Sequence, residues 1–265
     1  MSQAPAESSS IKTLATRHPF VFALLFFIVN ILLSLVVLRA IRLPIQIGGI
    51  VYFILGSLLA LSVLAWLGWL QAAGFNGPSN WRRLALLWLP ALITLFYLAP
   101  LLSVHSSSTA LVAYAALYAL LTGLCEEAQM RGVILQVLLP YGSLAAAALS
   151  ALFFGLGHLN NLFLFNPAVV IPQVAGATLL GFGFAAIRLR VNTIWPLIVL
   201  HMLDDLAVDI SLFASPGAVA SSSLPSPLVL AIVLIGPGLL LAAYGLYLLR
   251  HHRKGSEPLG TLRPA

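Results

Sequence analysis

Residues 110–139 read ALVAYAALYALLTGLCEEAQMRGVILQVLL, an apolar run that contains two carboxylates and one guanidinium. A helix needs about 20 apolar residues to cross the hydrocarbon core of a bilayer, so a run of this length predicts a membrane span. Each charge at the centre of a bilayer costs roughly 2.5–3.5 kcal/mol on insertion scales. The presence of Glu126, Glu127 and Arg131 inside this span therefore indicates a function for them.

The composition of the whole chain agrees with a membrane location. Of its 265 residues, 61% are hydrophobic and 8% are charged, whereas a soluble domain carries about a quarter charged residues. The net charge of +6 comes from basic residues that stand singly or in pairs beside apolar runs. Such residues are typical of membrane flanks, and they do not favour nucleic acid as a partner. The single cysteine, Cys125, excludes an internal disulfide.

The apolar runs predict an all-α fold, a polytopic transmembrane helix bundle of about eight spans within residues 19–249. The first run is too long for the core of a signal peptide, so we expect it to be a retained helix. A polar tail of residues 1–18 and a basic tail of residues 250–265 are expected to lack regular structure because of their composition. The predicted spans are residues 19–38, 47–72, 84–104, 110–139, 143–160, 168–187, 193–213 and 227–249.

The distribution of lysine and arginine orients the predicted bundle, because cytoplasmic loops carry an excess of these residues. With eight spans and both termini in the cytoplasm, only Arg39 and Arg42 fall on the other side, where they can snorkel to the interface. The Ala- and Leu-rich spans and the small size favour a bacterial cell membrane. The residues expected on the cytoplasmic side are Lys12, Arg17, Arg82, Arg83, Arg188, Arg190, Arg250, Arg253 and Lys254.

Few ionisable residues remain inside the spans, and spacing relates some of them. Glu127 and Arg131 are four residues apart with the acid nearer the amino end, which is the favourable order for a pair on one helical face. Glu126 is turned away by about 100°, and no local partner is available to it. Structural ion pairs between helices are the competing interpretation, which a cluster of this composition disfavours. The residues inside spans are Glu126, Glu127, Arg131, His158, His201, Asp204, Asp205 and Asp209.

Depth in the membrane gives a second relation. Glu126 lies 15 residues before Tyr141, and His158 lies 17 residues after it. At 1.5 Å per residue, both lie roughly 22–26 Å from that turn, so they come level in an antiparallel hairpin. His201 and Asp205 share a helical face. Their span begins on the same side of the membrane as the turn at Tyr141. If the fourth, fifth and seventh spans are neighbours, these side chains converge below the cytoplasmic surface.

Such a set suits hydrolysis. A desolvated carboxylate and a histidine can hold and deprotonate a water molecule, and a second histidine with an orienting acid can stabilise an oxyanion. Glu126, His158 and His201 also match the ligand types of a catalytic zinc site. The residues therefore predict hydrolysis of an amide, with or without a metal ion.

The residues now match a family. Glu126, Glu127 and Arg131 fit the pattern EExxxR, the segment from Phe154 to His158 fits FxxxH, and the segment from His201 to Asp205 fits HxxxN/D. Their order and spacing over about residues 84–212 resemble the CPBP family. This family comprises the CAAX proteases and bacteriocin-processing enzymes, also called Abi proteins, and includes the type II CAAX prenyl endopeptidase.

The resemblance implies a glutamate-dependent intramembrane endopeptidase. Glu126 would be the base for water and His158 would help to hold that water. Glu127 and Arg131 would be a supporting pair, and His201 with position 205 would stabilise the oxyanion. The family is described both as zinc metalloproteases and as metal-free enzymes, so the resemblance leaves Zn²⁺ open as a cofactor.

The resemblance also has implications for the substrate and for Asp205. It implies a peptide or protein substrate, membrane-associated or lipid-modified, within the lipid bilayer. Many relatives carry asparagine where this chain has Asp205, and an ionised aspartate cannot donate a hydrogen bond to an oxyanion. Asp205 must then be protonated, orient His201 or bind a metal.

Two other classes of function stay open. A bacteriocin-immunity or scaffold protein on the same fold would not need an unpaired buried glutamate, and its phenotype would survive Glu126→Ala. A small-solute transporter could use the buried acids as proton relays, although the sequence shows no internal repeat.

Overall fold

The computed structural model describes residues 10–41, 43–99, 101, 108–214 and 226–251. All regular structure in these ranges is helical, which confirms the predicted all-α bundle. Residues 1–9 and 252–265 of the two predicted tails, with Arg253 and Lys254, lie outside the described residues. Arg42 and the end of the third predicted span, residues 102–104, also lie outside them.

The helices follow one another along the chain with short irregular turns of helix between several of them. The elements are α1 (Ser10–Arg17), α2 (Pro19–Leu35), η1 (Val36–Ala40), α3 (Ile45–Leu67), η2 (Trp81–Leu87), α4 (Trp88–Leu98), α5 (Thr109–Glu127), η4 (Ala128–Ile134), α6 (Leu135–Leu138), η5 (Leu139–Tyr141), α7 (Ser143–Gly157), η6 (His158–Phe163), α8 (Pro167–Val191), α9 (Trp195–Ala214), α11 (Pro227–Leu234) and α12 (Gly236–Arg250).

Seven helical segments of the described chain are long and apolar enough to cross a membrane. Helix α9 is not among them, although it has 20 residues, because it carries three aspartates. It nevertheless packs against α5 and α4 inside the bundle, so the prediction of about eight spans holds. The seven segments are Pro19–Leu38, Ile47–Leu67, Trp81–Leu98, Thr109–Tyr141, Ser143–Phe163, Pro167–Val191 and Pro227–Arg250.

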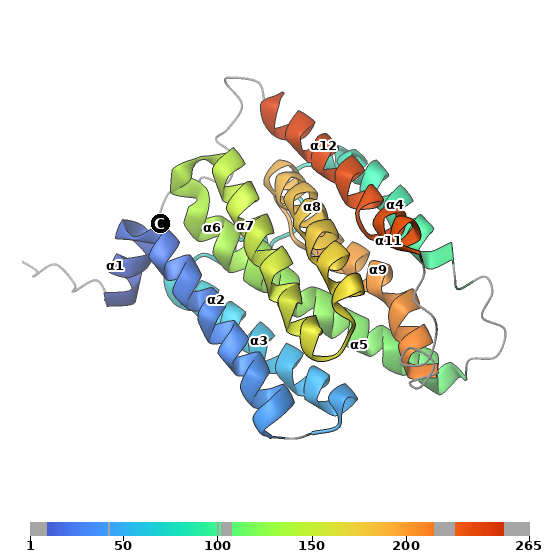
Figure 1. Cartoon of the computed structure of the whole chain (residues 1–265). Helices are drawn as coiled ribbons and strands as arrows, with labels where there is room; N and C mark the ends of the chain where they lie inside the picture. Colours follow the sequence, from blue (N-terminus) through green and yellow to red (C-terminus); the bar gives the residue numbers. More distant parts are fainter. Residues whose placement is uncertain (1–9, 42, 100, 102–107, 215–225, 252–265) are drawn as a thin grey trace, which may run out of the picture.

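Figure 1 shows α2 and α3 on one flank of the bundle, α4 and α12 on the other, and α5 to α9 between them. Helix α8 contributes to two core clusters. Ala185 and Leu189 pack in the cluster formed with α2, α3 and α7, whereas Phe184 and Ile187 pack in the cluster formed with α4, α9 and α12. Helix α8 thereby joins the two flanks of the bundle.

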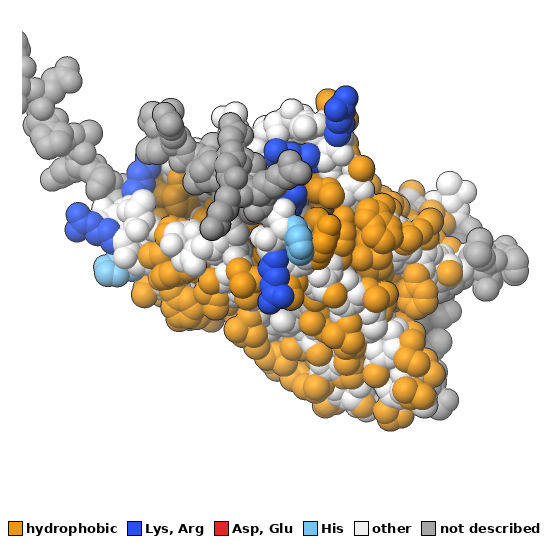
Figure 2. Space-filling model, turned by 90° about the horizontal axis from the view of Figure 1, so that it is seen from above, with side chains coloured by type: hydrophobic (Ala, Val, Ile, Leu, Met, Phe, Trp, Pro, Cys, Tyr) orange, Lys and Arg blue, Asp and Glu red, His pale blue; other side chains and the backbone are white. Residues whose placement is uncertain are grey.

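The outer surface of the bundle is largely apolar. Large side chains such as Leu58, Leu95 and Val208 are more than half exposed, as expected where lipid replaces water. Figure 2 shows basic side chains gathered on one face of the molecule, with no acidic side chain in view. The bundle therefore has an apolar belt and a basic face.

Two predictions about helix boundaries were wrong. Residues 10–17 of the polar tail form helix α1, because Leu14 and Ala15 lie on a face that packs against the main core. Helix α3 ends at Leu67 rather than at Ala72, because Gly68 has φ +72° and ends the helix in the left-handed conformation.

Candidate active site

The three motifs lie at changes of helical geometry or at a helix contact. The first motif spans the junction where α5 ends at Glu127 and the π-helical segment η4 begins. The second lies where α7 gives way to the 3₁₀ segment η6 at His158. The third lies on α9, which packs along α5, while η4 packs against α7. The condition for convergence, that these spans are neighbours, is therefore met.

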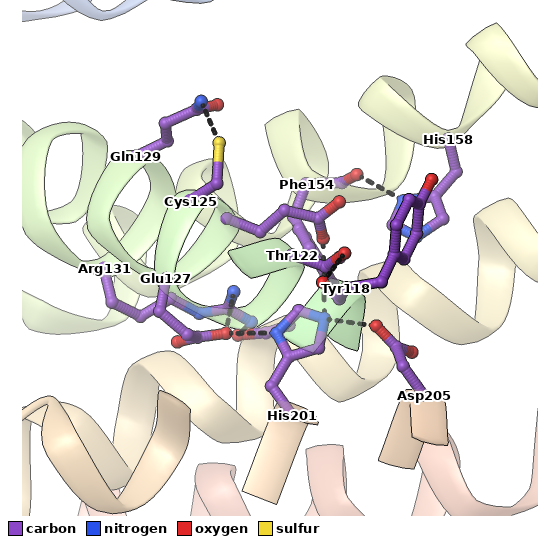
Figure 3. Close-up of polar contacts among 12 residues, drawn as sticks. Tyr118, Thr122, Cys125, Glu127, Gln129, Arg131, Phe154, His158, His201 and Asp205 are labelled. Atoms are coloured by element: carbon purple, nitrogen blue, oxygen red, sulfur yellow. Dashed lines mark hydrogen bonds and ion pairs between the residues drawn. The ribbon is translucent and has the colours of Figure 1, made fainter. Parts of the chain in front are cut away.

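Glu127 is the centre of a buried network. Its Oε1 accepts hydrogen bonds from Arg131 NH1 at 2.8 Å and from His201 Nδ1 at 2.9 Å. Figure 3 shows Arg131 beside Glu127 and His201 directed at the same carboxylate. The expected pair of Glu127 and Arg131 is present, and His201 extends it to a second helix. Because the carboxylate can only accept, Nδ1 of His201 carries a proton.

Arg131 is held by more than its carboxylate partner. Its NH2 group donates to the carbonyl of Gly181 at 3.4 Å. The guanidinium carbon lies 4.4 Å from the ring centroid of Phe154 and 5.5 Å from that of Phe184. Cation–π contacts of this kind stabilise a cation that is removed from water. The network explains how the chain tolerates a fully buried arginine.

The π-helical segment Ala128–Ile134 lies directly after the glutamate pair. A π-helix is wider than an α-helix and leaves backbone groups in need of other partners, and it is frequent at functional sites. Within this segment the carbonyl of Met130 accepts a hydrogen bond from Ser150 Oγ of α7 at 2.8 Å, in addition to one from the N–H of Leu135. The bond from Ser150 ties the first motif to the helix that carries the second.

Glu126 and Asp205 approach the other nitrogen of His201. Each has a carboxylate oxygen 3.5 Å from Nε2, a distance longer than that of a usual hydrogen bond. The Glu126 side chain is 25% exposed and that of Asp205 is 37% exposed, in contrast to the fully buried Glu127. Glu126 thus has no partner on its own helix, as expected, and lies loosely against His201.

His158 is oriented by the backbone of its own helix. Its Nδ1 lies 2.9 Å from the carbonyl oxygen of Phe154, and a carbonyl can only accept, so Nδ1 is the donor and, in the neutral ring, Nε2 is the acceptor. The ring of Phe154 stands edge-on to His158 at 4.9 Å and to His201 at 5.9 Å between centroids. Phe154 therefore contacts both histidines of the site.

Sequence reasoning missed the residue that lets α9 approach α5. A Cβ atom on Gly123 would lie 2.9 Å from the carbonyl oxygen of Ile198 and 3.5 Å from Cβ of His201. The close contact that brings His201 to Glu127 therefore requires glycine at this position. A small residue one helical turn before the glutamate pair was the available signal.

The predicted zinc ligands do not form a zinc site. Within the described ranges, no group of three His, Cys, Asp or Glu side chains is arranged to hold a metal ion. His201 directs Nδ1 at Glu127, and its Nε2 faces carboxylate oxygens of Glu126 and Asp205. Glu126, His158 and His201 therefore do not form a zinc site in the part of the chain that the structure describes.

The fold and the apolar helices define the class: a multi-pass integral membrane protein with a buried cluster of glutamate and histidine. Residues 107–207 match the family described as type II CAAX prenyl endopeptidase Rce1-like. This match confirms the family resemblance drawn from the three motifs, and it contains all six predicted site residues. At the level of the family it supports a protease related to the CAAX proteases. No curated protein and no solved structure matches the chain.

Proposed function

We propose that the protein is an intramembrane endopeptidase that hydrolyses a peptide bond with a water molecule activated by Glu126, without a metal ion. The observation that carries the proposal is the arrangement around His201. Its Nδ1 is bound to the buried Glu127, while its Nε2 lies 3.5 Å from Glu126. A carboxylate and an oriented imidazole thus adjoin a space that is accessible at Glu126.

Glu126 and His158 are the groups that would hold the water. Glu126 has free carboxylate capacity and is a quarter exposed, and His158 has an unprotonated Nε2 that can accept from water. Glu126 takes one proton from the water, and the hydroxide oxygen attacks the carbonyl carbon of the substrate. Glu126 then gives that proton to the leaving amine as the C–N bond breaks.

His201 is the group that would stabilise the oxyanion. Both of its nitrogens face carboxylate oxygens, and only a doubly protonated imidazole can donate to both sides. Because the 3.5 Å contacts at Nε2 are loose, the Nε2 proton is available to a substrate oxygen that carries developing negative charge. Glu127 and Arg131 fix the ring so that this donor is already in place.

Asp205 is then an orienting residue rather than an oxyanion donor. It lies one helical turn from His201 on α9, and its carboxylate contacts the same Nε2 that serves the substrate. Of the three roles that the sequence leaves open at this position, the contact supports orientation of His201. The departure from the asparagine of many relatives is compatible with this role, because an amide oxygen can also accept.

The substrate we propose is a peptide or protein segment that is membrane-associated or lipid-modified, because the site lies among membrane-spanning helices. We place both termini in the cytoplasm of a bacterial cell, since the basic side chains gather on one face (Figure 2). Reporter fusions at each terminus test this orientation, and an external signal from either one contradicts it.

The experiment that tests the proposed function is a census of protein termini in membranes. Cells carrying the wild type are compared with cells carrying Glu126→Ala or the isosteric Glu126→Gln at matched expression. We expect a set of new termini that is present only with the wild type. Identical termini with both folded variants, and a retained phenotype, would contradict the protease and favour a non-catalytic immunity or scaffold protein.

A further inference from the structure

The carboxylates of the chain are concentrated around one helix pair. Five of its seven acidic residues lie in α5 and α9, and the other two lie outside the described residues. Neither helix contains a lysine or arginine, and Arg131, in η4 directly after α5, is already bound to Glu127. The helix pair therefore carries more negative charge than its own cations balance. The five residues are Glu126, Glu127, Asp204, Asp205 and Asp209.

The proposed mechanism does not use Asp204 or Asp209, and Asp209 is the one that shares a face of α9 with the site. It lies eight residues after His201 and four after Asp205, so the three share a face of α9. It is only 8% exposed, and its Oδ2 atom has no hydrogen-bond partner within the described part of the chain. A buried carboxylate without a partner is costly, which indicates that a ligand supplies the missing partner.

Aromatic rings stand beside Asp209. Tyr114 and Tyr118 of α5 each lie 5.1 Å from Phe213 of α9 between ring centroids, and 6.5 Å from each other. Asp209 and Phe213 are four residues apart on one face of α9, so the carboxylate lies on the side of the helix that carries this aromatic group. All three aromatic residues are partly exposed. A carboxylate beside partly accessible aromatic faces is the arrangement that recognises an organic cation.

We propose that Asp209, Tyr114, Tyr118 and Phe213 form a subsite for a lysine or arginine side chain of the substrate. Lysine and arginine supply the hydrogen-bond donor that Oδ2 lacks and the cation that the rings attract. Two helical turns separate Asp209 from His201, which is roughly 12 Å along the helix axis. An extended peptide covers about 3.3 Å per residue, so the cationic residue lies about three to four residues from the scissile bond.

This inference rests on the proposed function, and a peptide series tests it. Purified full-length protein in lipid nanodiscs receives neutral fluorogenic peptides in which one lysine is moved stepwise away from the cleaved bond. We expect a lower KM when the lysine is three or four residues away. Asp209→Asn should raise that KM about tenfold or more, since truncating one partner of a buried charge pair is costly, and leave kcat unchanged. The peptide with norleucine in place of lysine should be unaffected.

Two further variants separate recognition from a structural role. Asp209→Glu keeps the charge and should retain the preference for lysine. Asp204→Asn is the matched control, because it removes a carboxylate from the same helix, and this carboxylate lies toward Tyr97 of α4. The Asp204→Asn variant should keep the preference for the lysine peptide. Equal effects of Asp209→Asn on the lysine and norleucine peptides, with the variant folded, would overturn the subsite.

A binding measurement distinguishes failure of the subsite from failure of the proposed function. The labelled lysine and norleucine peptides are titrated against Glu126→Gln, with and without Asp209→Asn, by fluorescence anisotropy. Cleavage by the wild type without any preference for lysine would overturn the subsite and leave the protease standing. Preferential binding of the lysine peptide without cleavage by the wild type would support the subsite and contradict the protease.

Discussion

Arg131 and Arg188 are buried to the same extent, about 1% exposed each, yet their surroundings differ in kind. Arg131 binds a carboxylate and lies over two aromatic rings. Arg188 instead donates to backbone carbonyls, from Nε to Ala73 at 2.9 Å and from NH2 to Ala72, and lies 3.4 Å from Oδ1 of Asn192. One guanidinium organises titratable side chains, and the other fixes the path of the chain after α3.

The comparison shows that a buried arginine can have two structural roles in this bundle. Around Arg131 the charge is neutralised, so that other charged groups can be placed nearby with defined orientation. Around Arg188, Nε and NH2 satisfy the backbone carbonyls of Ala73 and Ala72 in the segment after α3, and NH1 donates to the side chain of Asn192. The segment after α3 is also bound through Ile194, whose N–H donates to the carbonyl of Gly74 at 2.9 Å.

The largest effect is expected from Arg131→Met. The substitution leaves the carboxylate of Glu127 buried without its cation, and breaking a buried pair in this way costs about 3–5 kcal/mol. We expect loss of peptide cleavage and a large fall in the thermal unfolding temperature in detergent. The double variant Arg131→Met/Glu127→Gln removes both charges and should regain stability without activity. Unfolding of the single variant at the wild-type temperature would contradict the role of the pair.

Gly123→Ala tests whether the approach of α9 sets the geometry around Arg131. The new Cβ would displace Ile198 and with it His201, and a misplacement of about 1 Å can reduce a rate about 100-fold. We expect a loss of this order in kcat with a smaller change in stability. Gly236→Ala is the matched control, because nothing lies within 4 Å of its Cβ position. Equal activity of the two variants would show that the approach is not critical.

Arg188→Met sharpens the comparison by making the same change in the other region. It leaves two carbonyls without donors, at a cost of about 1–3 kcal/mol for each group left unsatisfied. We expect a lower unfolding temperature and faster proteolysis within residues 69–77, with cleavage activity retained below the unfolding transition. Loss of activity in the folded variant would mean that this region also controls the site.

The smallest effect is expected from Asp205→Asn. The amide oxygen of asparagine can face Nε2 of His201 as the carboxylate oxygen does, so we expect kcat within about tenfold of the wild type. Asp205→Leu removes the acceptor and should lose more activity than Asp205→Asn. A metal chelator should affect neither the wild type nor these variants. Restoration of chelated enzyme by added zinc would contradict the metal-free proposal.

Local spacing predicted the parts of the structure that depend on a single helix. The pair of Glu127 and Arg131 follows from a separation of four residues, and the spans follow from the lengths of the apolar runs. In each case the helix geometry alone fixes the relation between the residues.

Contacts between helices were not predictable in the same way. The bond from His201 to Glu127 depends on Gly123, on the side-chain rotamers and on the π-helical segment, none of which follows from spacing. Arg188 was interpreted as a charge at the membrane interface, but it is buried against the segment after α3. The rule that places basic residues at the cytoplasmic side describes their side of the membrane, and it does not describe their partners.

The position of Phe154 gives the site a built-in spectroscopic reporter. Its ring contacts the guanidinium of Arg131 and the imidazoles of His158 and His201, as Figure 3 illustrates for the four side chains. A fluorine atom on this ring would report on the supporting cation and on both histidines in one ¹⁹F resonance. Protonation changes and substrate entry could then be followed in the intact protein without altering any group that takes part in the chemistry.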